Sequence, residues 1–294
     1  MKLARGLGLL VTLGALSGCA ELRARSHARE GNQLYRDGNY EAAVREFEAA
    51  ERLFPDLPVV ALNKGLACRQ LMIPGSKSPE SQRAVDCALE AFRKLKELRP
   101  DDPRGDQLYV QTLFDGDRYE TLAAMYEKQH RENPKELVPI NGLIQVYTRW
   151  DRPDDALRWT MRRAEVQPQD AEAQYAVGVF LWNELFQKGG AGDKATYDPR
   201  PEAANPAPPP VFGEGDIVGE KRVELADLGI KYLEKALSLR PTYREAMVYM
   251  NLLYRQKSIA YFDEPAKWQA AVDAAETWRK KAMESDLSAK GTAP

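Results

Sequence analysis

Histidines, cysteines, paired carboxylates and one glycine-rich segment are the residues of this sequence that could do chemistry. The two histidines, His27 and His130, lie far apart, so neighbouring residues build neither a zinc cluster nor a Ser/His/Asp arrangement. The segment from Gly189 to Thr196 is glycine-rich, but Lys194 does not directly follow its last glycine and no buried strand precedes it. We therefore expect no enzyme activity, no metal site and no cofactor, with both histidines exposed on helices.

Paired carboxylates occur at two predicted helix starts. Asp101 and Asp102 precede one helix, and Asp154 and Asp155 open another. Aspartate at such positions accepts hydrogen bonds from free backbone N–H groups. We interpret both pairs as helix caps.

Cys68 and Cys87 fall in the two helices of one predicted repeat and flank a loop. In an oxidising compartment they could form a disulfide worth about 3 kcal/mol, provided that their Cα atoms lie within about 7 Å. Otherwise they are buried thiols that pack as small hydrophobic groups. The sequence leaves both alternatives open.

The N-terminus has the pattern of a processing signal. Lys2 and Arg5 precede an apolar run from Leu7 to Leu16, which is about half the length of a membrane-spanning helix. The next residues, 16–20, read Leu-Ser-Gly-Cys-Ala and resemble the lipobox of bacterial lipoproteins. The resemblance implies that residues 1–18 are removed, that Cys19 is lipidated, and that residues 19–26 form a short tether. Alanine rather than aspartate after the cysteine implies an outer-membrane anchor facing the periplasm.

Composition and charge describe an ordinary globular chain. Its 294 residues are 44% hydrophobic and 29% charged, which is ample for a core. The formal charge of −2 becomes −4 when Lys2 and Arg5 leave with residues 1–18. Lysine and arginine alternate with glutamate and aspartate rather than forming a basic face, so the sequence does not indicate a nucleic-acid partner.

The segment from Gly31 to Pro55 organises the rest of the chain. Small residues at Gly31, Ala43 and Ala50 allow two helices to cross closely, and Tyr40 and Phe47 fill the remaining space. This pattern resembles one tetratricopeptide (TPR) repeat, a two-helix unit with a period of 34 residues. One such unit cannot bury its own apolar face, so more should follow.

Proline spacing supports an array of repeats. Pro100, Pro134 and Pro168 are 34 residues apart. The TPR resemblance implies an all-α fold, a right-handed α-α superhelix (TPR solenoid) of about six helix-turn-helix repeats with two inserted loops. The array occupies residues 27–285 and ends in a flexible tail at 286–294. The repeats are expected at about 24–57, 58–102, 103–136, 137–170, 171–243 and 244–285.

Two insertions interrupt the period. The first is the loop at residues 72–79, and the second is a Pro/Gly-rich insertion at about 188–222, which favours extended conformation. Our hypothesis is that the second insertion folds back over an apolar patch formed by Tyr175, Val179 and Trp182.

The TPR resemblance places the first helix of each repeat along a concave groove that binds protein or peptide partners. Polar residues dominate its early part and aromatic residues its late part. The predicted groove residues are Asn32, Tyr35, Arg36, Asn63, Leu66, Arg69, Arg104, Gln107, Gln111, Phe114, Asn141, Gln145, Arg149, Tyr175, Val179, Trp182 and Arg255. Asn32, Asn63 and Arg104 match three residues of the carboxylate clamp in chaperone-binding TPR domains, but Ala28 and Leu108 replace two of its cations.

We therefore expect a non-enzymatic, lipid-anchored periplasmic scaffold of bacterial TPR-lipoprotein type, serving cell-envelope or outer-membrane complex assembly. The alternative is a transport-accessory lipoprotein that binds a small ligand or a periplasmic binding protein. A polar-lined pore would favour the alternative, and an open groove would favour the scaffold.

Overall fold

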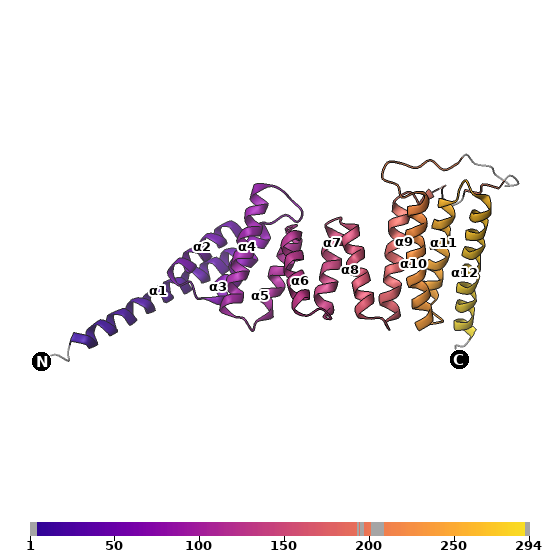
Figure 1. The fold of residues 1–294 in the computed structure, drawn as a ribbon. Coiled ribbons are helices and arrows are strands. Elements are labelled where there is room, and N and C mark those ends of the chain that lie inside the picture. Colours follow the sequence, from indigo (N-terminus) through magenta and orange to yellow (C-terminus); the bar gives the residue numbers. More distant parts are fainter. Residues whose placement is uncertain (1–4, 193, 195–196, 201–208, 292–294) are drawn as a thin grey trace. The chain divides into compact units, whose positions relative to one another are not determined.

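The computed structural model describes residues 5–192, 194, 197–200 and 209–291, with side chains described from Cys19 to Ser285 outside the same gaps. Over these residues the fold is helical (Figure 1), with helices α1 Arg5–Arg36, α2 Tyr40–Leu53, α3 Pro58–Leu71, α4 Pro79–Leu98, α5 Pro103–Asp115, α6 Tyr119–Glu132, α7 Leu137–Arg149, α8 Pro153–Val166, α9 Ala171–Gln187, α10 Gly219–Leu239, α11 Arg244–Ala260 and α12 Pro265–Gly291. The chain forms two compact units, Met1–Met125 and Tyr126–Pro294, called unit 1 and unit 2 below.

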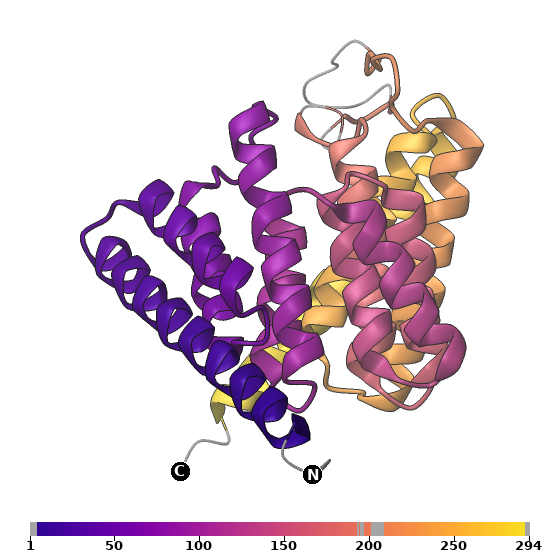
Figure 2. The same ribbon diagram turned by 90° about the vertical axis from the view of Figure 1, so that its left-hand side faces the viewer.

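Consecutive helices pack in pairs within each unit. In unit 1, α1 contacts α2 and α3 contacts α4; in unit 2, α7 contacts α8, α9 contacts α10, and α11 contacts α12. The second helix of a pair also contacts the first helix of the next, as α2 does with α3 and α10 with α11. Figures 1 and 2 show α9 to α12 side by side in unit 2. The predicted all-α fold of paired helices is confirmed.

In the pairs α1–α2, α3–α4 and α9–α10, a glycine on the first helix lies against a large side chain on the second. A Cβ atom added to Gly31 would lie 2.8 Å from a ring carbon of Phe47, and one added to Gly65 would lie 2.4 Å from the ring of Phe92. Both rings are fully buried. The helices approach so closely that any side chain on these glycines would push them apart.

The turns between paired helices need a left-handed residue. Gly38 has φ +77°, and Asp117 and Asp151 each have φ +55°. Asp117 and Asp151 are one period of 34 residues apart, and each precedes the start of a second helix as Gly38 does. Glycine adopts this conformation at no steric cost, and aspartate is one of the few other residues that tolerates it.

Helix α1 continues through the predicted tether. Residues 19–26 are helical, and Ala24 is fully buried in the core of unit 1 together with Phe47 and Ala50. The packed part of the first pair thus begins only a few residues after Cys19, whose side chain is exposed. Among the described residues, no helix combines the length and apolar character needed to cross a membrane.

Helix α12 extends into the predicted tail, residues 286–294, and ends at Gly291. Residues 292–294 lie outside the described part of the chain.

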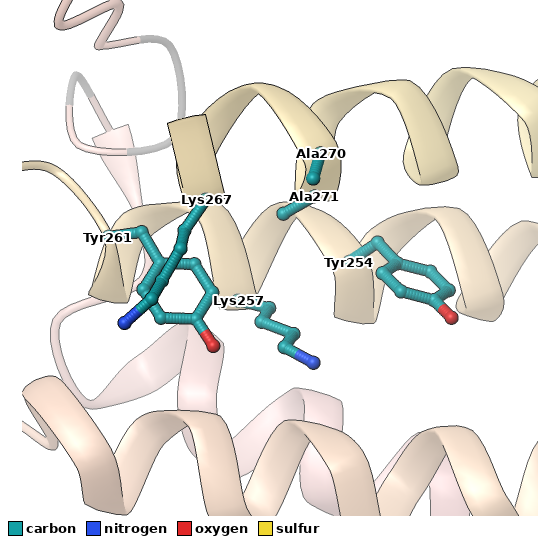
Figure 3. A pocket seen from close by; sticks show the side chains of 6 residues that line it. All are labelled: Tyr254, Lys257, Tyr261, Lys267, Ala270 and Ala271. Carbon is teal, nitrogen blue, oxygen red and sulfur yellow. The ribbon is translucent and has the colours of Figure 1, made fainter. Parts of the chain in front are cut away.

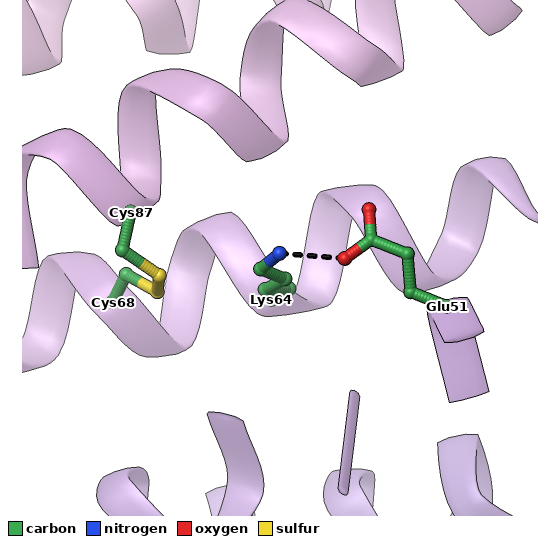
Figure 4. The surroundings of a disulfide bond; sticks show 4 residues. All are labelled: Glu51, Lys64, Cys68 and Cys87. Carbon is green, nitrogen blue, oxygen red and sulfur yellow. Dashed lines mark hydrogen bonds and ion pairs between the residues drawn. A yellow bond between two sulfur atoms is a disulfide. The ribbon is translucent and has the colours of Figure 1, made fainter. Parts of the chain in front are cut away.

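A disulfide bond joins α3 and α4 next to a buried ion pair in unit 1 (Figure 4). Cys68 and Cys87 are bonded through sulfur with their Cα atoms 5.9 Å apart. One helical turn before Cys68, Lys64 Nζ lies 2.6 Å from Glu51 Oε2, with the lysine side chain only 7% exposed. Both interactions connect neighbouring helices of unit 1.

We predict that reduction of the Cys68–Cys87 bond destabilises unit 1 by about 3 kcal/mol, because the unfolded chain regains the entropy that the cross-link removes. Urea denaturation of a C19S protein with and without dithiothreitol measures the loss. The C19S/C68A/C87A protein should have equally low stability with or without the reductant. Two reactive thiols in the denatured, unreduced C19S protein would contradict the prediction.

Candidate functional site

The predicted groove residues all lie on first helices of the pairs, and none of them is buried. They come from α1 (Asn32, Tyr35, Arg36), α3 (Asn63, Leu66, Arg69), α5 (Arg104, Gln107, Gln111, Phe114), α7 (Asn141, Gln145, Arg149), α9 (Tyr175, Val179, Trp182) and α11 (Arg255).

In unit 1, five of the residues surround one pocket. Asn32, Tyr35 and Arg36 of α1 and Asn63 and Leu66 of α3 line a cavity of about 130 Å³. Asn63 Nδ2 donates a hydrogen bond of 2.7 Å to Asn32 Oδ1. This bond leaves the second N–H of Asn63 and the amide N–H groups of Asn32 for a ligand, and such amides suit a peptide backbone.

Two other arginines of the predicted groove in unit 1, Arg69 and Arg104, have partners that the sequence analysis did not identify. Arg69 donates to Gln111 Oε1 at 2.9 Å and to Asp115 Oδ2 at 2.7 Å, which ties α3 to α5. Arg104 is bound by Asp102 at 2.6 Å, and this hydrogen bond is the main reason why the pKa of Asp102 falls to about 2. Asp102 also caps α5, as predicted, by accepting from the backbone N–H of Arg104.

The interpretation of Asp154 and Asp155 as helix caps is wrong. The N-cap position of α8 is Arg152, which makes no side-chain cap hydrogen bond, and both aspartates lie in the first turn of the helix. The Asp155 carboxylate is buried and pairs with both Arg152, at 2.5 Å, and Arg158. Two guanidinium groups compete better for a carboxylate than a backbone N–H does, because the hydrogen bonds are charge-assisted.

In unit 2, the surface of α9 and α11 carries a row of aromatic rings. The ring of Tyr249 lies 5.5 Å from that of Tyr175 and 5.3 Å from that of Trp182, edge-on in both cases. Trp182 in turn stacks on Phe186 at 5.1 Å. Burial raises the pKa of Tyr175 to about 12, with further contributions from Tyr249 and Glu172. Tyr175, Trp182, Phe186 and Tyr249 are called the aromatic row below.

Tyr249 and Phe186 were missing from the predicted groove. Phe186 is 39% exposed, which is unusual for a phenylalanine. Its position four residues after Trp182 would have indicated that it shares the helix face.

The Pro/Gly-rich insertion attaches elsewhere than the hypothesis assumed. Arg200 donates to Gln269 Oε1 at 3.0 Å, and Phe212 packs on Phe262 with their ring centroids 5.9 Å apart. Both contacts lie at the α11–α12 end of unit 2, whereas Tyr249 is the residue packed against Tyr175 and Trp182. The described part of the insertion therefore does not support the predicted cover over the patch, and residues 201–208 lie outside that part.

A buried arginine fixes the base of the insertion. The Arg222 side chain is fully buried and donates to the carbonyl oxygens of Leu185 (3.1 Å), Lys188 (2.6 Å) and Ile217 (2.7 Å), and to Gln256 Oε1 at 2.5 Å. Burial lowers its pKa to about 10. These carbonyl groups include the free ones at the end of α9, so Arg222 both terminates that helix and holds the returning chain.

The prediction that both histidines are exposed is wrong. His27 is half-buried, and its Nδ1 lies 2.6 Å from Glu46 Oε2. His130 is also half-buried, and its ring meets the ring of Trp159 edge-on at 4.9 Å. His130 Nδ1 and Trp159 Nε1 are buried atoms for which the described residues supply no hydrogen-bond partner. Helix periodicity does not reveal which neighbouring helix covers a residue, so it does not predict the partial burial of either histidine.

Within the described residues, no group of three or more His, Cys, Asp or Glu side chains is arranged to hold a metal ion. The described groove side chains offer hydrogen bonding, ion pairing and aromatic packing.

Comparisons with known proteins find solved structures of low similarity. Similar solved structures include a MamA protein (13% identity, 92% of this chain and 96% of that chain, TM-score 0.29) and MamA from Desulfovibrio magneticus RS-1 (15%, 90% and 96%, TM-score 0.28). A third is YrrB, described as a TPR protein with an unusual peptide-binding site (15%, 90% and 90%, TM-score 0.27). At these TM-scores the likeness carries no argument about function. No protein-family model and no curated protein matches the sequence.

We predict that unit 2 loses stability as the pH falls below about 6.5, because burial and then Arg162 lower the pKa of His130 in the folded state. The unfolded chain therefore binds the proton more tightly, and the loss ends at the folded pKa. Urea denaturation between about pH 7.5 and 5, followed by tryptophan fluorescence, measures the effect.

The matched variant is His130→Phe, which keeps a ring against Trp159 and cannot titrate. Its stability should fall less over the same pH range than that of the wild type. An identical pH dependence for both proteins would contradict the assignment to His130.

Proposed function

We propose that this chain is a non-enzymatic, lipid-anchored scaffold in the bacterial cell envelope that binds extended segments of partner proteins along the first helices of its pairs. The observation that carries the proposal is the pocket in unit 1. Side chains from α1 and α3 line it together, so a ligand there contacts two consecutive pairs at once. An extended chain with its repeating N–H and C=O groups is the ligand that such a row of amides fits.

The two units offer different chemistry to such a ligand. In unit 1 the accessible groups are the Asn32–Asn63 amides and the Arg69–Gln111–Asp115 network. In unit 2 the aromatic row offers partly exposed rings, and tyrosine and tryptophan are enriched at binding hot spots. We infer that polar parts of a partner bind unit 1 and apolar side chains bind unit 2.

The lipid anchor rests on the lipobox resemblance at Cys19 and on its position. Cys19 is exposed, and the buried part of the first pair starts at Ala24. An anchor there would hold the scaffold close to the membrane surface. Multiple acyl chains give stable attachment, whereas a single chain gives marginal attachment.

Photo-crosslinking in intact cells tests the groove. A benzoylphenylalanine at Arg36, Gln107 or Asn141, on first helices, should form adducts with a discrete set of partners. The same group at Arg93 of α4 or Glu165 of α8, which are equally exposed on second helices, should form none of them. Equal adducts from both sets of positions would refute groove binding.

Metabolic labelling tests the anchor. An alkyne-tagged fatty acid should label the wild type and the C68A/C87A variant equally, because only Cys19 is modified. The Cys19→Ala variant should lose about 90% or more of the label, because one residue carries all the acyl chains. It should also leave the membrane fraction. Retention of label by Cys19→Ala would refute the lipoprotein assignment.

A further inference from the structure

A cleft at one end of unit 2 lies apart from the first-helix faces. It has a volume of about 530 Å³ and is lined by the start of α10 and the turn between α11 and α12, through residues Gly219, Glu220, Val223, Ala260, Tyr261, Phe262, Asp263, Glu264 and Lys267. Volumes in this range are typical of ligand sites.

The cleft adjoins a smaller pocket of about 260 Å³ (Figure 3). The two cavities share Tyr261 and Lys267, and the smaller one is closed by Ala270 and Ala271 of α12 and by Tyr254 and Lys257 of α11. Lys257 is neutralised by Asp227 at 2.7 Å. The smaller pocket therefore adds mainly apolar surface.

The charges on the cleft wall do not balance. Three carboxylates, those of Glu220, Asp263 and Glu264, face one ammonium group, that of Lys267. Lys267 pairs with Glu264 at 2.6 Å. Among the described residues, neither Glu220 nor Asp263 has an ion-pair partner. The wall is thus negative on balance, which attracts cations.

One half of the cleft already shows how a cation is held there. The Lys267 ammonium lies against the carboxylate of Glu264 and 5.4 Å from the ring centroid of Tyr261. Figure 3 shows the lysine side chain crossing the tyrosine ring. A carboxylate together with an aromatic face is a favourable environment for an ammonium or guanidinium group.

The cleft wall also has a second aromatic ring and two carboxylates that are not paired with a cation among the described residues. Phe262 supplies the ring, and Asp263 and Glu220 supply the carboxylates. Phe262 is held in place by Phe212 of the insertion, and the insertion is fixed at its base by Arg222. Val223 and Ala260 provide apolar surface for the methylene groups of a ligand.

We propose that this cleft binds an organic cation, an alkylammonium or guanidinium group attached to a hydrocarbon stem, as in a lysine or arginine side chain or a polyamine. The carboxylates are spread around an aromatic-lined cleft, and the described side chains offer no set arranged to chelate a metal. An organic cation uses the rings and the carboxylates together, whereas a hydrated divalent ion prefers converging oxygen ligands.

Two of the same carboxylates raise the pKa of Lys267. Its pKa is raised, mainly by its hydrogen bond and charge interaction with Glu264 and further by Tyr261 and Asp263. An added ammonium group would experience the same carboxylates.

Isothermal titration of the full chain tests the proposal, at an ionic strength of about 0.15 M so that weak surface attraction is screened. The probes are a blocked tri-lysine peptide, the same peptide acetylated on its three ε-amines, spermidine and Ca²⁺. The wild type should bind the tri-lysine peptide or spermidine. Stronger binding of spermidine points to free polyamines, and stronger binding of the peptide points to polypeptide side chains.

The test variant is E220Q/D263N, which removes two charges with little change in shape. It should bind the cationic probes at least tenfold more weakly. The control E90Q/E97Q makes the same charge change at two exposed positions of α4 in unit 1 and should bind like the wild type. Circular dichroism melts check that both variants fold, and D263N alone, which leaves the first turn of α10 intact, should show a smaller loss.

Three results would overturn the proposal: equal binding of the acetylated peptide, unchanged binding to E220Q/D263N, or displacement of the probes by equimolar Ca²⁺. The groove can fail its crosslinking test without affecting this outcome, since the cleft uses none of the groove residues.

Discussion

The contact between a glycine on the first helix of a pair and a large side chain on the second is the constraint on which the fold depends. It recurs in both units, as Gly31 against Phe47 and as Gly178 against Leu233, where an added Cβ would lie 2.5 Å from the leucine. The second case is informative because the whole insertion separates the two residues. Two helices can therefore pack as a pair even when a long loop joins them, because the entropy cost of closing a loop rises slowly with its length.

Buried polar groups then determine the register of neighbouring helices, which apolar packing alone leaves open. Removing a charge from water is expensive unless it is paired and hydrogen-bonded. Lys64 meets this condition with Glu51 between α2 and α3, and Arg222 meets it with carbonyl oxygens of α9 and of the returning insertion. An arginine is suited to the second role because its planar fork reaches several acceptors at once. Such sites define one register where leucine and alanine alone would permit several.

The sequence was sufficient to predict the helix pairs, because small residues, aromatic residues and prolines recur at fixed spacing. It was insufficient for the side-chain partners of the candidate site. Arg69 and Asp115 are 46 residues apart, and no period connects them. His130 meets Trp159 across two different helices, α6 and α8. Periodicity assigns a residue to a helix face, while its partner depends on the helix that covers that face. The same reason explains why the burial of Arg222 does not follow from its position in the sequence.

The described part of the insertion packs at the α11–α12 end of unit 2 and not over the aromatic row. Its described contacts, Arg200 with Gln269 and Phe212 with Phe262, lie at the α11–α12 end of unit 2 and leave the partly exposed rings of Trp182 and Phe186 uncovered. By packing on Phe262 it shapes the wall of the negative cleft. The predicted groove residues and the residues that line the cleft do not overlap. A partner chain on the first helices and a cation in the cleft would occupy unit 2 at the same time, and any coupling between them would have to pass through α11, which carries Tyr249 on one face and leads into Tyr261 at its end.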